Sequence, residues 1–157
     1  MDKEKVMKNL RVAISNVMET MFFEPVQIIE KDMTLQEWFS DNSSIIGATL
    51  GFSGPLTGSF YLLIPVSATD EIVSNFLGID TEEIDDEQRV DTVKEALNMI
   101  GGGSFSLFDK DGEFKLSIPE LMSKEKCAYD QLGHIKGDTV FLESTDNRLA
   151  AGVKIET

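Results

Sequence analysis

The sequence contains one cysteine and one histidine in 157 residues. A single cysteine, Cys127, excludes an intrachain disulfide, which is usual for proteins of reducing compartments. Together with His134 it cannot supply the four ligands of the usual zinc sites. A Cys/His nucleophilic pair is the remaining alternative, and the linking stretch CAYDQLGHI has no signature of one. The sequence therefore predicts neither a disulfide-stabilised protein nor a zinc protein.

Long apolar runs are also missing. The longest, FYLLIPV at residues 60–66, is far shorter than the roughly 20 residues that span a bilayer. The first 23 residues, MDKEKVMKNLRVAISNVMETMFF, carry charges throughout and lack the apolar centre of a signal peptide. We therefore expect a cytoplasmic protein.

Positive charge is scarce. Lysine and arginine number 14 against 28 aspartates and glutamates, so the formal net charge is −14. A field of this sign repels phosphate backbones and anionic lipids, which makes nucleic acid and membrane surfaces poor partners. The length suits one domain, which we expect to span residues 1–157, and the 41% hydrophobic content is ordinary for a soluble fold.

Periodicity and turn signals predict the order of the elements. Helical spacing over residues 4–23 predicts a long first helix, which Pro25 ends. VQII reads as a short strand and TLQEWF as a turn of helix. Strands are expected around SGPLTG, a short helix in SATDEIVSNFLG, and two more strands around STDNR. This order predicts an α+β domain of two related halves, with the long helices on one face of a mostly antiparallel β-sheet.

A further strand is expected after the Asp-Gly turn in SFSLFDKDGEFKLSIP. Its apolar residues Phe114, Leu116 and Ile118 alternate. Asp109 and Asp111 precede this strand and raise the alternative of a calcium site. An EF-hand loop needs further oxygen ligands and a terminal glutamate, which are absent here, so a turn is favoured.

The second long helix is predicted around DTVKEALNMIGGG, residues 91–103. Asp85, with Gln88 three residues later, resembles a capping box that begins it. Helix propensity alone ends it at Ile100, before the glycines at 101–103. Because the glycines follow a helix instead of leading into one, they do not form a phosphate-binding loop.

This helix has two distinct faces. At about 100° per residue, Asp91, Glu95 and Asn98 share one side, with Lys94 beside them, and we call these three residues the acid–amide stripe. The stripe is expected to be exposed, because the opposite side carries the core residues: Val90, Val93, Leu97 and Ile100, with Ala96 at the margin.

A merely polar helix face is the plainer interpretation of the acid–amide stripe. Two features count against it. Acids four residues apart repel each other, and asparagine is a poor helix former. A carboxylate can bind a cation, and a carboxamide can both donate to and accept from water. The combination suits the orientation of a hydrolytic water on a substrate presented by another macromolecule.

Four stretches between Gly51 and Pro119 carry a family resemblance. GFSGPLTGSFYLLIP, FLGID, DTVKEALNMIGG and GEFKLSIPE occur in this order over nearly half the chain. Together they resemble the CheC/CheX family of chemotaxis phosphatases, and CheX-type members most closely. The resemblance implies a CheC-like pseudo-two-fold repeat in a single CheX-like domain. It also implies that the second long helix continues past Ile100.

The resemblance also implies a reaction, the hydrolysis of aspartyl-phosphate on a phosphorylated CheY-like response regulator. By position, Glu95 would contact the regulator's lysine and Asn98 would orient the hydrolytic water, as the two catalytic residues. Asp91 would support docking, and Pro119 matches a proline that follows the motif. The Mg²⁺ would belong to the regulator, so the protein would have no metal site or cofactor of its own.

CheC-type members carry the motif on both related helices. The first helix here has Ser15 and Glu19, but Phe22 stands where the amide would fall. We therefore expect a single active motif, as in CheX-type members, which are homodimers, and a homodimer is implied by this analogy. The alternative function is a non-catalytic CheX-like adaptor, which would have no chemical need for Glu95 and Asn98.

Overall fold

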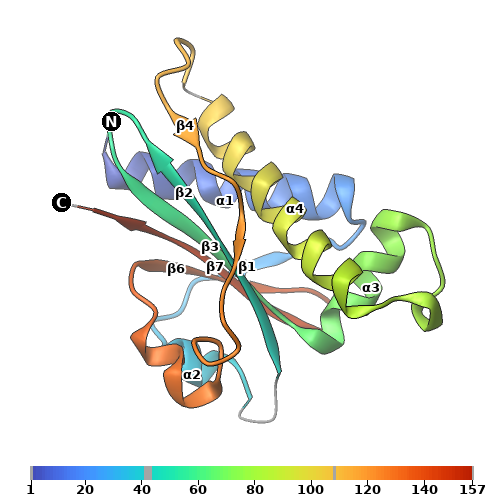
Figure 1. Cartoon of the computed structure of the whole chain (residues 1–157). Coiled ribbons are helices and arrows are strands. Elements are labelled where there is room, and N and C mark those ends of the chain that lie inside the picture. The colour runs from blue at the N-terminus through green and yellow to red at the C-terminus, as the bar shows by residue number, and fades with distance from the viewer. Residues whose placement is uncertain (1, 41–43, 108, 157) are drawn as a thin grey trace.

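The computed structural model describes residues 2–40, 44–107 and 109–156 (Figure 1). The helices are α1 (Lys3–Met21), α2 (Leu35–Trp38), α3 (Val66–Leu77) and α4 (Asp86–Ser106), with short 3₁₀ helices η1 (Thr81–Glu83) and η2 (Tyr129–His134). The strands are β1 (Gln27–Ile29), β2 (Ile45–Ser53), β3 (Gly58–Pro65), β4 (Lys115–Leu116), β5 (Glu120–Leu121), β6 (Asp138–Glu143) and β7 (Arg148–Ile155).

The strands form one sheet in the order β1-β6-β7-β3-β2-β4, with β5 also paired to β2. Each of these pairings between described strands is antiparallel. The hairpins β2–β3 and β6–β7 meet at the centre through β3 and β7. β1, which follows α1, pairs with β6, whereas β4 and β5, which follow α4, pair with β2. In each half, the strand that follows the long helix thus pairs with a strand of the other half, as a pseudo-two-fold repeat requires. The predicted α+β fold is confirmed.

The central strand β3 is buried on both of its faces. Its side chains alternate between the faces, so Phe60 and Leu62 join the core beneath α1 and α4, while Tyr61 and Leu63 join a second cluster. Residues of α2 and η2, among them Trp38, cover this second cluster. Figure 1 shows α1 and α4 together on one side of the sheet and α2 on the other. The long helices therefore share one face, as predicted.

Helix α4 continues through the three glycines to Ser106, so the prediction from propensity that it ends before them is wrong. The cause is close packing. Gly101 is buried against β2, where a Cβ atom would lie 2.5 Å from Cδ2 of Leu50. A Cβ atom on Gly103 would lie 3.4 Å from Cβ of Ala13 on α1. Burial of this face, which ends at Phe105, outweighs a propensity cost of about 1 kcal/mol per glycine.

The predicted alternating strand after the Asp-Gly turn is also largely wrong, because β4 contains only Lys115 and Leu116. Ile118 lies outside both strands and is 82% exposed. The hydroxyl of Ser117 accepts a hydrogen bond from the Gly51 amide at 2.8 Å, where a regular ladder would use a backbone carbonyl. Pro119 has no N–H to donate. The regular ladder with β2 therefore ends at β4, Ser117 still bonds to Gly51, and the ladder begins again at β5.

The turn before β4 is confirmed, and Asp109 forms it. One carboxylate oxygen of Asp109 accepts from the Glu113 amide at 2.8 Å, and the other accepts from the Phe114 amide at 3.0 Å. Both oxygens are therefore used by the backbone. Over the described residues, no cluster of histidine, cysteine, aspartate or glutamate could hold a metal ion.

Because of Tyr61, we expect the free energy of unfolding to fall at alkaline pH. Its side chain lies in the second cluster, with its hydroxyl hydrogen-bonded to Thr139, and burial raises the pKa of Tyr61 from 10.0 to about 12. The unfolded chain then loses this proton first, so the stabilisation is complete below about pH 10 and is lost between about pH 10 and 12. The loss should reach about 3 kcal/mol. Denaturant unfolding across this range measures it.

Two variants separate the contribution of Tyr61 from other alkaline effects. In Tyr61→Phe the decline between pH 10 and 12 should become shallower. In Tyr129→Phe, which changes an exposed tyrosine, the decline should match the wild type. Equal slopes in all three proteins would contradict the assignment to Tyr61.

Candidate functional site

The acid–amide stripe lies on the exposed side of α4. Asp91, Glu95 and Asn98 are all exposed, whereas Val93 and Leu97 between them are buried, as the helical spacing predicted. Successive members of the stripe are about 6 Å and 4.5 Å apart along the helix axis. The stripe is therefore a nearly straight row of polar groups open to solvent.

The boundary of the core side differs slightly from the prediction. Val90 is only half-buried, whereas Ala96, expected at the margin, is fully buried. Thr92, which the sequence did not place in the core, is also buried. The buried side is thus rotated a little toward Thr92 and Ala96, and the stripe remains outside it.

The polar groups of the stripe have no bonding partners within the described part of the chain. The side chains of Asp91, Glu95 and Asn98 form no hydrogen bond or ion pair there, and neighbouring Lys94 forms no salt bridge. The two carboxylates and the amide are therefore free to bind groups of another molecule.

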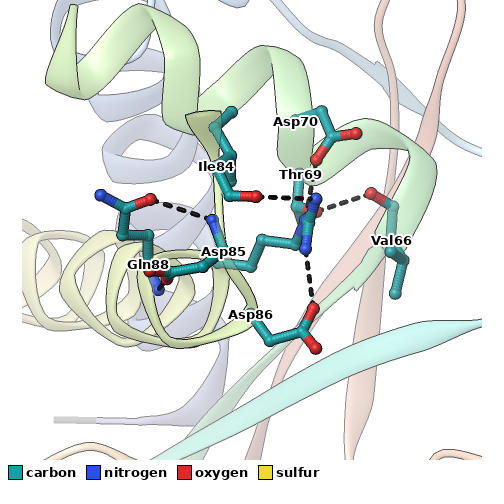
Figure 2. Close-up of polar contacts among 8 residues, drawn as sticks. Val66, Thr69, Asp70, Ile84, Asp85, Asp86 and Gln88 are labelled. Atoms are coloured by element: carbon teal, nitrogen blue, oxygen red, sulfur yellow. Dashed lines mark hydrogen bonds and ion pairs between the residues drawn. The ribbon is translucent and has the colours of Figure 1, made fainter. Parts of the chain in front are cut away.

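A capping box sets the start of α4. The Asp85 carboxylate accepts from the Gln88 amide at 2.8 Å, and the Gln88 side chain accepts from the Asp85 amide at 3.0 Å (Figure 2). Each bond satisfies a backbone N–H group that would otherwise lack a partner. The predicted capping box does begin the helix, with Asp86 as the first helical residue.

Arg89 joins the start of α4 to α3. Its Nε donates to Asp70 at 2.8 Å and its Nη1 to Asp86 at 2.7 Å, while Nη2 donates to the Ile84 carbonyl at 3.4 Å (Figure 2). The hydrogen bond to Asp70 raises the pKa of Arg89 further above its usual range. With this contact at one end and Gly101 packed on the sheet toward the other, the stripe lies on a fixed element.

The related positions on the first helix do not form a second site. Ser15 is half-buried and Glu19 is exposed, but Phe22 follows the last residue of α1 and is fully buried. Its ring stacks on Phe76 of α3 with a centroid distance of 4.8 Å. The third position of this half is therefore part of the core, where neither water nor a partner can reach it.

Cys127 and His134 do not act together. Cys127 is buried in the second cluster, and burial raises the pKa of its thiol, so the thiolate is disfavoured. His134 is exposed, and its Nδ1 lies 2.9 Å from Oε1 of Gln131. This rules out the nucleophilic pair considered from the sequence.

A cavity beside the start of α4 was not predicted from the sequence. It has a volume of about 530 Å³ and lies between the first turns of α4, the start of β2 and the segment from β5 to Cys127. No local pattern could have indicated it, because its walls come from separated parts of the chain. Its lining includes Ile46, Val66, Arg89, Val90, Leu121 and Met122.

The fold has two long helices on one face of an antiparallel sheet, and one of these helices carries the exposed acid–amide stripe. This combination is that of the CheC-like chemotaxis proteins, the class that the sequence resembles. The family model described as chemotaxis phosphatase CheX matches residues 46–139. The chain therefore belongs to the CheX family. No curated protein sequence matches it.

Solved structures agree with this assignment at the level of the fold. The chemotaxis protein CheX from Vibrio vulnificus is 19% identical, with a TM-score of 0.73, and the match covers 96% of each chain. A CheX from Desulfovibrio desulfuricans is 18% identical, with a TM-score of 0.70, over 97% of this chain and 99% of that one. A CheX–CheY–BeF₃–Mg²⁺ complex from Borrelia burgdorferi is 15% identical, with a TM-score of 0.69, over 97% and 98%.

No helix within the described ranges is both long enough and apolar enough to cross a bilayer.

Proposed function

We propose that this protein is a phosphatase that hydrolyses the aspartyl-phosphate of a CheY-like response regulator. The observation that carries the proposal is the pair Glu95 and Asn98, exposed one turn apart on a fixed helix and without partners in the described chain. The family is one of chemotaxis phosphatases, and the B. burgdorferi relative was solved together with CheY, which supports this choice of substrate.

Each residue of the stripe has a separate role in this proposal. Glu95 pairs with a lysine of the regulator and sets the docking register. Asn98 accepts a hydrogen bond from the attacking water through its carbonyl oxygen and directs the water oxygen at phosphorus, in line with the leaving carboxylate. Asp91 supports docking. Phosphoryl transfer is accelerated mainly by positioning and electrostatics, so a few well-placed groups suffice. Each tenfold gain in rate requires about 1.4 kcal/mol.

The partners of this protein in the proposed reaction are the regulator, with its metal ion, and a second copy of the chain. Mg²⁺ belongs to the regulator's phosphorylation site, and this chain contributes no cofactor. The net charge of −14 makes nucleic acid and membrane surfaces poor partners. A homodimer, implied by analogy with CheX-type proteins, completes the assembly, and light scattering measures it.

A turnover assay tests the proposal directly. Candidate receiver domains are phosphorylated with a small-molecule phosphodonor, the donor is removed, and the loss of phosphate is followed with this protein at one-hundredth of the receiver concentration. A phosphatase removes many equivalents per molecule. A non-catalytic adaptor, the second candidate, binds the receiver without accelerating hydrolysis. Binding with no multiple turnover would decide for the adaptor.

Glu95→Ala should weaken docking of the receiver. Loss of the carboxylate removes a charge-assisted contact with the partner's lysine, so we expect kcat/KM to fall about 10- to 100-fold, mostly through KM. Titration calorimetry with a BeF₃-activated receiver and steady-state kinetics measure the two effects. Glu87→Ala, which removes an exposed acid from the first turn of the same helix, is the control and should bind normally. An unchanged binding curve for Glu95→Ala would argue against the lysine contact.

A further inference from the structure

The segment between β4 and β5 runs along α4, the helix that carries the stripe. At one end, Leu116 lies next to α4, since a Cβ atom on Gly101 would be 3.6 Å from Cδ2 of Leu116. At the other end, Leu121 lines the same cavity as Val90 of α4. The segment therefore runs antiparallel to α4, from the level of Gly101 to the level of Val90. Figure 1 shows the chain from β4 passing along this helix.

The two lengths are similar. Leu116 pairs with Phe52 and Leu121 with Ala48, so the five residue steps of the segment cover four steps of β2, about 13 Å. Eleven helical steps from Gly101 to Val90 cover about 16 Å. Ile118, two steps along the segment, therefore lies level with the part of α4 between Glu95 and Asn98. This alignment places an apolar side chain at the same level along α4 as the two proposed catalytic residues.

Ile118 is held in position although its side chain is exposed. It is 82% exposed, the largest fraction among the large apolar side chains of the described ranges. The preceding residue is fixed by two hydrogen bonds with Gly51: the Ser117 amide donates to the Gly51 carbonyl at 2.8 Å, and the Ser117 hydroxyl accepts from the Gly51 amide. Because the Ser117 hydroxyl faces β2, the next side chain along the extended segment points away from β2.

We propose that Ile118 is an apolar anchor for the phosphorylated receiver domain and contacts the surface next to its phospho-aspartate. This proposal rests on the proposed phosphatase function. A standard protein interface buries about 800 Å² on each partner, a patch of roughly 16 Å radius. A receiver that brings its lysine to Glu95 and its phosphate to Asn98 therefore also covers Ile118.

Charge explains why such an anchor is needed. The stripe is acidic, the chain carries −14, and the phosphoryl group that it approaches is also an anion. Electrostatics beyond the lysine contact therefore opposes docking. Burial of a fixed aliphatic side chain adds affinity independent of charge, at little further cost in conformational entropy.

Ile118→Ser tests the anchor by its separate effects on KM and kcat. We expect KM for the phosphorylated receiver to rise about tenfold, with kcat within twofold of wild type, because the serine variant leaves Glu95 and Asn98 in place. Ile118→Leu, which keeps an aliphatic side chain of the same size, should have the wild-type KM. Val12→Ser, which removes a 50% exposed aliphatic side chain from α1, is the matched control and should leave both constants unchanged. Ile118→Thr retains the branched Cβ and repeats the test if serine disturbs the sheet edge.

The other outcomes overturn the proposal. Equal KM values for wild type, Ile118→Ser and Val12→Ser would exclude the anchor while leaving the phosphatase function intact. A fall in kcat with KM unchanged would assign Ile118 to another role. A change in oligomeric size of Ile118→Ser by light scattering would show that a second copy of this chain covers the residue. If wild-type protein hydrolyses no phosphorylated receiver, the proposed function fails, and the anchor fails with it.

Discussion

Asn98→Ala is expected to lower kcat on the phosphorylated receiver by about 100-fold or more while leaving receiver affinity within about twofold of wild type. In the proposed mechanism the amide acts only on the attacking water, and loss of such positioning costs about two orders of magnitude in rate. The fold should be unaffected, because Asn98 is exposed and its side chain forms no hydrogen bond or ion pair within the described chain. Single-turnover kinetics at saturating protein measure the chemical step.

The structure offers a matched control for this substitution. Asn16 is an exposed asparagine on α1, the helix related to α4 by the pseudo-two-fold repeat. Asn16→Ala removes the same group from a helix that lacks the complete motif, so turnover should remain at the wild-type level. Unchanged single-turnover rates for Asn98→Ala would reject the assigned role. A loss of receiver binding equal to the loss of rate would instead assign Asn98 to docking.

Gly101→Val is expected to lower the free energy of unfolding by about 3 kcal/mol. A side chain here overlaps Leu50, which is fully buried and has little room to move. Overpacking of this kind typically costs about 1–3 kcal/mol, and the better helix propensity of valine relative to glycine offsets only a few tenths of a kcal/mol. Denaturant unfolding measures the change. Because α4 must then move away from β2, kcat/KM should also fall.

The neighbouring glycine provides the control. A Cβ atom on Gly102 would meet nothing within 4 Å outside its own turn. Gly102→Val should therefore change stability by less than about 0.5 kcal/mol, and Gly102→Ala should stabilise the protein by up to about 1 kcal/mol. Equal destabilisation by valine at both positions would show that contact with β2 does not set the cost of a side chain at Gly101.

Predictions from local patterns were reliable where one element decides the outcome. The capping box at Asp85 and Gln88, the exposure of Glu95 and Asn98, and the turn at Asp109 were all predicted from spacing, and all are present. Each depends on groups within about one turn of the chain. The roles of the stripe in hydrolysis stay a prediction, supported by the family to which the chain belongs.

Predictions failed where contacts between distant parts of the chain determine the local structure. Propensity ended α4 at Ile100, but the helix continues because Gly101 packs on Leu50 of β2, some fifty positions earlier in the sequence. Alternation predicted a strand through Ile118, but bonding of Ser117 to Gly51 and the missing N–H of Pro119 leave that residue outside the ladder.

The sequence by itself determined the α+β class, the order of the elements and the exposed acid–amide stripe, because hydrophobic periodicity and capping act over a few residues. Only the tertiary structure decided that α4 runs through its glycines and that the segment from Leu116 to Leu121 lies along this helix. Both depend on how closely a helix approaches a sheet edge, a distance set by side chains that are far apart in sequence and meet only in the folded protein.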